Sequence, residues 1–197
     1  MTHRNLTTLL ATAVLALPGF AAADDLSYNY LDLSYSESEI DVGDIDVDGD
    51  GLTLAGSLAV APNWHVFADF AATDFDFGID ATTLRAGGGY NYGISDSADV
   101  IARVFAIRTE LEVDGGGDSD DTGIGIGVGL RALVMPSLEL EGAIDYVEVE
   151  FAGDDSGEAL FTGGARYFVT PQIALGGTVS VGDDIMTFGI NGRFNFR

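Results

Sequence analysis

The chain has 197 residues, of which 47% are hydrophobic and 27 are glycine, and it contains no cysteine. Acidic residues outnumber basic ones by 32 to eight, which gives a formal net charge of −24. The lack of cysteine excludes disulfides, thiol nucleophiles and thiolate metal sites, and the negative charge makes nucleic acid a poor partner and divalent cations good ones.

The first 23 residues have the pattern of a secretory signal peptide. Basic residues precede an apolar stretch from Leu9 to Leu17, and the small residues 21–23 provide a cleavage site. A transmembrane helix needs about 20 apolar residues, and this stretch is shorter. We therefore predict a cleaved signal over residues 1–23 and a single domain over residues 24–197.

After the signal, the chain divides into segments that alternate between apolar and small or polar positions. In the segment 122–134, for example, Ile126 and Val128 alternate with Gly125 and Gly127. A period of two residues indicates a strand. Glycine and arginine cannot form a dry core, so the apolar face is predicted to contact lipid and the other face to line a closed transmembrane barrel.

This alternation predicts an all-β, closed, up-and-down antiparallel transmembrane barrel, with ten strands preferred and eight as the alternative. The predicted strands cover residues 28–37, 52–61, 64–74, 82–92, 98–113, 122–134, 138–151, 158–169, 172–181 and 185–196.

The connections between these strands are of two kinds. Short ones are built on Pro62, Pro136 and Pro171, which favour turns, whereas acidic and longer ones include residues 37–51 and 114–121. Bacterial barrels place short turns in the periplasm and long loops outside. We therefore predict an outer-membrane location with both termini periplasmic and the acidic loops extracellular.

Charged residues fall on the inward side of the predicted strands. The predicted lumen charge network consists of Arg85, Arg103, Arg131, Arg166, Arg193, Asp69, Glu139, Glu141 and Asp145. Arg131 and Glu141 lie five residues on either side of Pro136, so a tight hairpin would place them opposite each other. The network either closes and stiffens the barrel or forms a constriction that selects ions. Inward Phe67 and Phe105 favour closure.

An acidic segment before the second predicted strand suggests calcium binding. Residues 46–51 match the first six positions of an EF-hand loop, but Ser57 replaces the final glutamate and Leu52 already begins a strand. A complete EF-hand is therefore not expected. Two interpretations stay open: a weak calcium site at Asp46, Asp48 and Asp50, or a solvated acidic loop. No other cofactor is predicted.

Three segments carry a resemblance to known proteins. LSYNYLDLSYS, GLTLAGSLAVAPNWHVFADF and GGGYNYGISDSADVIARV are similar to small outer-membrane barrels of Gram-negative bacteria of the OmpA or OmpX type, nearest to the xanthomonad family of small exported surface barrels. The resemblance covers the mature chain and implies no catalytic residues. It implies that Phe194 and Phe196 form the signal recognised by the outer-membrane assembly machinery.

Enzymatic activity is not expected, because His65, the only histidine beyond the signal, adjoins a short turn rather than the extracellular rim where barrel hydrolases hold theirs. We predict a structural or surface-interaction barrel with acidic, cation-binding loops. Its expected partners are outer-membrane lipid and lipopolysaccharide, with the oligomeric state open. The alternatives are a narrow porin-like channel and a soluble periplasmic calyx.

The assignment of faces also leads to an expectation for single substitutions. Val128→Arg places a charge on the predicted lipid face and should impair assembly, whereas Gly127→Ser on the inward face should be mild.

Overall fold

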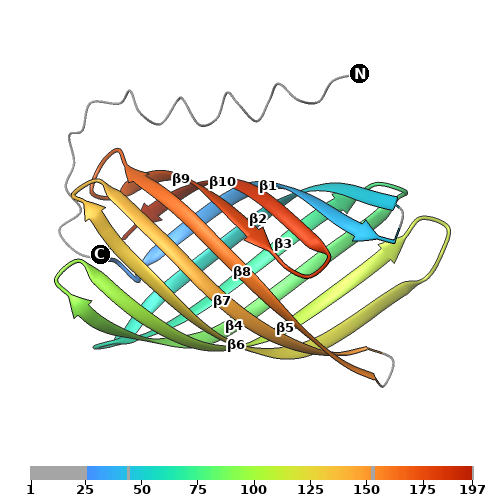
Figure 1. Cartoon of the computed structure of the whole chain (residues 1–197), viewed down its shortest axis with the longest axis horizontal. Coiled ribbons are helices and arrows are strands. Elements are labelled where there is room, and N and C mark those ends of the chain that lie inside the picture. Colours follow the sequence, from blue (N-terminus) through green and yellow to red (C-terminus); the bar gives the residue numbers. More distant parts are fainter. Residues whose placement is uncertain (1–25, 44, 152–153, 197) are drawn as a thin grey trace.

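The computed structural model describes residues 26–43, 45–151 and 154–196, which form a closed ten-strand β-barrel (Figure 1). Each strand pairs antiparallel with its neighbours in sequence, and β1 pairs with β10 to close the sheet. The all-β barrel and the preferred strand number are confirmed. The predicted signal peptide lies outside the described residues. The strands are β1 (Tyr30–Val42), β2 (Ile45–Ala61), β3 (Trp64–Phe75), β4 (Ile79–Ser95), β5 (Ala98–Val113), β6 (Asp118–Met135), β7 (Leu138–Phe151), β8 (Asp154–Phe168), β9 (Ile173–Val181) and β10 (Ile185–Asn195).

The two faces of the sheet have opposite character. Along β2, the side chains of Leu52, Leu54 and Leu58 are exposed on the outer surface, whereas Ser57 between them is buried. Large exposed hydrophobic side chains occur on the outside of all ten strands. An apolar outer surface around a polar interior is the arrangement of a transmembrane barrel. It is the reverse of a soluble calyx, so that alternative is wrong. No helix in the described part of the chain is long and apolar enough to span a membrane.

The two ends of the barrel differ. We call the end that carries the connections 62–63, 96–97, 136–137 and 169–172 the turn end, and the opposite end, on the right of Figure 1, the acidic end. The connections between strands are short at both ends. At the turn end Asn63 has a φ of 68°, a left-handed conformation that asparagine tolerates in tight turns. The described chain also begins and ends here, where the Phe196 N–H donates to the Asn29 carbonyl at 3.0 Å.

The acidic end contains more strand and less loop than the sequence suggested. Most of the segment 37–51, predicted as a loop, is a hairpin in which β1 continues to Val42 and β2 begins at Ile45. The polar composition of this segment is typical of a loop. The two-residue alternation nevertheless continues through it, with Ile40 and Val47 on the inner face. Backbone pairing therefore extends beyond the apolar band.

Candidate functional site

The structure places all nine charged residues of the predicted lumen network on the inner face of the barrel. They lie in two layers. Arg131, Arg166, Arg193, Glu139 and Glu141 meet near the turn end and are joined by Asp32, which sequence analysis missed. The pairs Arg103–Asp145 and Arg85–Asp69 lie nearer the acidic end. From here on, the lumen network means these ten residues.

Glu139 is the centre of the first layer. Its side chain is only 1% exposed. The carboxylate accepts hydrogen bonds from Arg131 Nε at 3.1 Å, Arg131 Nη2 at 3.0 Å and Arg166 Nη1 at 2.8 Å. Arg193 Nη1 lies 3.7 Å from the same carboxylate. One buried carboxylate is therefore shared by three guanidinium groups, two of which form charge-assisted hydrogen bonds with it.

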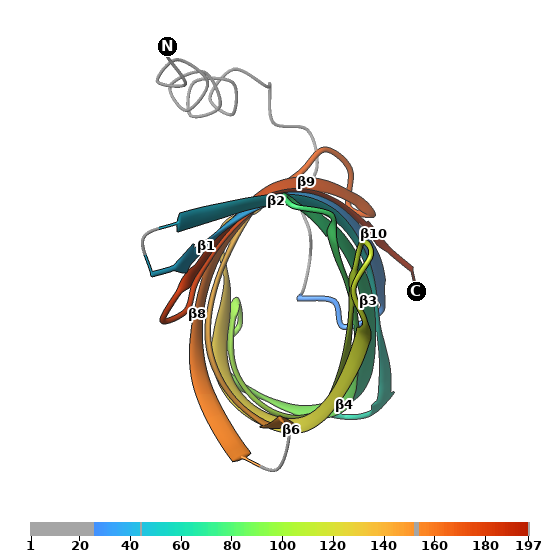
Figure 2. The same ribbon diagram turned by 90° about the vertical axis from the view of Figure 1, so that its right-hand side faces the viewer.

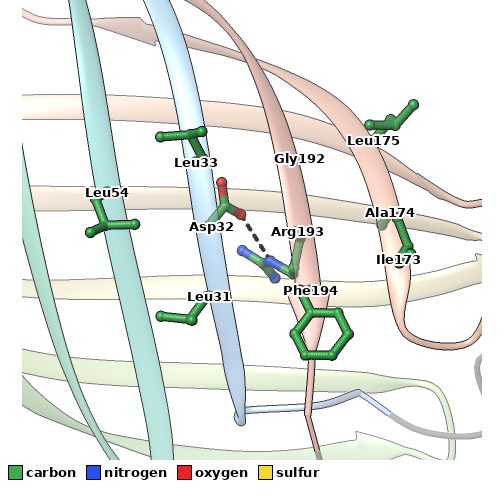
Figure 3. A pocket seen from close by; sticks show the side chains of 10 residues that line it. All are labelled: Leu31, Asp32, Leu33, Leu54, Ile173, Ala174, Leu175, Gly192, Arg193 and Phe194. Carbon is green, nitrogen blue, oxygen red and sulfur yellow. Dashed lines mark hydrogen bonds and ion pairs between the residues drawn. The ribbon is translucent and has the colours of Figure 1, made fainter.

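Two further carboxylates complete the charge balance of this layer. Arg166 Nη2 donates to Glu141 Oε1 at 2.8 Å, and Arg193 Nε donates to Asp32 Oδ2 at 3.0 Å. Three arginines thus face three carboxylates. The Arg193–Asp32 pair joins the last strand to the first, and Figure 3 shows it bridging β10 and β1. Buried charges that are paired in this way avoid the large cost of an unpaired ion.

The second layer combines ion pairs with aromatic rings. Arg103 Nε donates to Asp145 Oδ1 at 2.7 Å, with a second contact between the same side chains, and Arg85 Nε donates to Asp69 Oδ1 at 2.9 Å. The Arg85 guanidinium lies 5.2 Å from the ring centroid of Phe105, which is 3% exposed. Ion pairs and rings together occupy this depth of the lumen.

Inward glycines of β6 provide the room for these side chains. A Cβ at Gly125 would strike the Phe105 ring, and a Cβ at Gly127 would strike the Asp145 carboxylate and lie 3.0 Å from Arg103 Nε. For Gly127→Ser this geometry favours a destabilising effect instead of the mild one expected from the sequence, because the ion-paired Asp145 carboxylate must move. The sequence showed a small residue on the inner face, but it did not show which side chain uses the space.

The predicted cross-strand pair is confirmed in register but not in bonding. Arg131 lies directly opposite Glu141, as expected from the turn at Pro136. Its guanidinium nevertheless binds Glu139, the diagonal neighbour, while Glu141 binds Arg166. Long side chains reach diagonal positions on a tilted sheet, so backbone register alone does not determine ionic partners.

Other functional residues were also missed by sequence reasoning. Asp32 could have been found, since it shares the inward phase of Tyr30 and Ser34. Tyr28 begins the predicted strand 28–37, but in the structure it precedes β1 and crosses the lumen, which the strand period does not predict. Its hydroxyl donates to Asp99 Oδ2 at 2.8 Å, and burial raises the pKa of Tyr28 above its usual range despite the opposing effect of Arg131. The phenol therefore remains protonated as a donor.

The candidate calcium ligands lie on a strand rather than in a loop. Asp46, Asp48 and Asp50 occupy alternate, exposed positions of β2. Residues two apart on a strand are separated by about 6.6 Å and point in parallel, whereas calcium ligands converge. This segment therefore does not have the geometry of an EF-hand loop, in line with the expectation that a complete EF-hand is absent. Within the described residues, no group of three or more acidic or histidine side chains is placed to hold a metal ion. Weak calcium binding itself stays a prediction.

Carboxylates of neighbouring strands lie side by side across the outside of the barrel at its acidic end. Six exposed acidic residues, each directly opposite the next in register, cross β1 to β6. Like charges that face each other across strands are destabilising unless counterions screen them. We call this set the carboxylate row, and its members are Glu37, Asp50, Asp74, Asp80, Glu112 and Asp118.

The outer surface also has a shallow depression where the barrel closes. It has a volume of about 340 Å³ and lies around Gly192, whose missing side chain leaves a notch between Leu33, Leu175 and Phe194 (Figure 3). Its walls are apolar side chains of the outer face. It is therefore a feature of the lipid-facing surface at the β1–β10 junction.

Comparisons with known proteins agree with this geometry. Residues 7–184 match the family model described as outer membrane protein beta-barrel domain. The structure is similar to an outer membrane channel from Pseudomonas putida F1, with a TM-score of 0.55 and 12% identity over 91% of this chain and 100% of that one. It is also similar to the beta domain of the Bordetella autotransporter BrkA, with a TM-score of 0.52 and 13% identity over 85% and 99%. Comparison with curated proteins gives no significant match. Identities this low support the fold alone.

Proposed function

Because the chain belongs to the outer membrane protein beta-barrel domain family, we propose that this outer-membrane β-barrel is a structural and surface-interaction protein with a closed lumen and no enzymatic activity. The observation that carries the proposal is the charge-balanced lumen network. Five arginines face five carboxylates in two layers that cross the interior.

The burial of this network distinguishes a closed barrel from a filter. Ions that pass through a selectivity filter contact its charged lining, which must be accessible to water. Here Glu139 is 1% exposed, Asp145 2% and Arg166 3%, and each is paired with an opposite charge. Such groups support a rigid interior more than a conduction path.

This proposal predicts that the purified protein does not conduct. We expect no single-channel steps when the full mature chain is reconstituted in planar lipid bilayers in potassium chloride, under conditions in which an open porin conducts. Stable steps would instead favour the alternative, a narrow channel for ions or small solutes. That alternative is supported by the side chains of Arg85 and Arg103, which are 29% and 27% exposed.

We further propose the orientation and partners of the barrel. The turn end faces the periplasm and the acidic end faces the exterior. Support for this orientation comes from the acidic hairpins, in which strand pairing extends beyond the apolar band at one end only, since bacterial barrels place their larger polar segments outside. The apolar outer face contacts outer-membrane lipid, and cations on the carboxylate row bridge to lipopolysaccharide. Phe194, exposed on the outer face of β10, together with Phe196 supplies the signal for the assembly machinery.

Cation binding at the acidic end leads to a second prediction. Millimolar calcium should raise the melting temperature of the detergent-folded protein by mass action on the folded state. Asp50→Asn with Asp74→Asn and Asp80→Asn should remove more of this shift than Asp46→Asn, Asp48→Asn and Asp50→Asn, because the first set interrupts the carboxylate row on three neighbouring strands. Equal stabilisation by sodium at matched ionic strength would reduce the effect to screening and contradict the cation site.

A further inference from the structure

The residues just before β1 turn into the barrel instead of leaving along its wall. Figure 2 shows this short blue stretch inside the ring of strands. The Ser27 carbonyl accepts a hydrogen bond from Arg131 Nη1 at 3.1 Å. Arg131 belongs to β6, which is five strands away from β1 in either direction around the barrel. The segment Ser27–Asn29 therefore contacts the wall opposite to its own strand.

Tyr28 is held between three strands of the barrel. Its ring stacks on His65 of β3, with centroids 4.6 Å apart and an interplanar angle of 24°. The Arg131 guanidinium lies 4.8 Å from the ring centroid, and the hydroxyl donates to Asp99 of β5. The side chain is 8% exposed. Stacking, cation–π and charge-assisted contacts thus act on one ring.

Asn29 anchors the other end of the segment. Its Oδ1 accepts a hydrogen bond from the Ala59 N–H of β2 at 2.8 Å, and its carbonyl accepts one from the Phe196 N–H. The ladder of β1 begins one residue later, with Tyr30 opposite Asn195. Ser27 and Tyr28 therefore take no part in strand pairing, and their movement would break no strand pair.

The segment fills the part of the lumen that the lumen network leaves open. The first layer of ion pairs extends from β6 through β8 to β10 and β1. The facing strands carry His65 and, opposite it, Gly89, where a Cβ would strike the imidazole. Among the described residues, His65 Nδ1 is buried without a hydrogen-bond partner, and the imidazole ring stacks on Tyr28.

We propose that Ser27–Asn29 is a displaceable strap that closes the β2–β5 side of the lumen at the turn end. Withdrawal of Tyr28 admits water and small cations, because it frees the Asp99 carboxylate to face the opening. The inference rests on the proposed function in one respect: it requires a closed lumen when the strap is seated.

The strap is tested by measuring access to Ser57, which is buried on β2 two residues from the strap's anchor at Ala59. The chain has no cysteine, so Ser57→Cys gives a unique label site. We expect a small, water-soluble methanethiosulfonate to label this variant at least roughly tenfold faster when Tyr28→Ala is added, since a minor open conformer is populated at about 0.1–10% in the unaltered protein.

Control variants distinguish release of the strap from a general loss of barrel stability. Tyr35→Ala removes an outward ring of β1 that is exposed to lipid, and labelling should stay slow. Tyr28→Phe keeps the ring but loses the bond to Asp99, and labelling should be intermediate. His65→Ala removes the surface on which Tyr28 stacks while the tyrosine stays in the chain, so the strap should leave its seat more often and labelling should rise. This variant carries the test if Tyr28→Ala does not fold by circular dichroism.

The outcomes distinguish this inference from the proposed function. Equal labelling with and without Tyr28, in folded protein, overturns the strap, and a non-conducting unaltered protein would then leave the proposed function in place. Rapid labelling and channel steps in the unaltered protein overturn both. Fast labelling only after Tyr28→Ala or His65→Ala supports the strap. If these variants also show cation-selective channel steps, the opening continues past the second layer of the lumen network.

Discussion

Glu139→Ala is expected to lower the free energy of unfolding by about 3–5 kcal/mol, the cost of breaking a buried ion pair by removing one partner. The carboxylate binds Arg131 and Arg166 and is almost fully buried, so its loss leaves positive charge in a confined interior. Urea unfolding of the detergent-folded protein, followed by circular dichroism, measures the change. Glu139→Gln should cost less, because the amide oxygen still accepts one hydrogen bond.

A double-mutant cycle identifies the ionic partner of Arg131. Arg131→Ala combined with Glu139→Ala should recover part of the summed losses, since the two groups are bonded to each other. The same cycle with Glu141→Ala should show a smaller coupling, because Glu141 bonds to Arg166. A larger coupling for the register pair Arg131 and Glu141 would contradict the observed geometry.

Val128→Arg is the second substitution with a large expected effect. Val128 is 56% exposed on the outer face of β6, in the middle of its apolar stretch. An arginine near the bilayer midplane destabilises transmembrane barrels by about 2–4 kcal/mol. Folding into lipid vesicles, monitored by protease protection and by urea titration, should show this loss, whereas Val128→Leu should fold normally. Normal folding of Val128→Arg would reverse the assignment of the two faces.

The neighbouring residue provides a control with a different mechanism. Gly127→Ser should also destabilise the barrel, because its side chain displaces the Asp145 carboxylate from Arg103. Adding Asp145→Ala should make the serine nearly neutral, since the obstructing group is then absent. Gly142→Ala on the outer face, where the nearest atom lies 3.9 Å from the added carbon, should be mild.

Much of the architecture follows from the two-residue alternation. Ile124 to Val134 on one side and Gly125 to Arg131 on the other determine which face of β6 meets lipid, and the register at Pro136 follows from its tight turn. Strand ends at the acidic end were less predictable. There, Asp46 and Asp48 have the composition of a loop, but backbone pairing with β1 continues through them.

The sequence by itself determined the closed barrel, the inward position of the five lumen-network arginines and the two unlike ends, because these depend on residue type and strand period. Only the tertiary structure decided the contacts inside. Arg131 binds Glu139 instead of Glu141 because strand tilt brings diagonal side chains together, and a side chain at Gly127 would displace Asp145, which occupies that space. Tyr28 reaches Arg131 because closure of β1 on β10 places β6 across the lumen, a proximity that no local pattern in the sequence encodes.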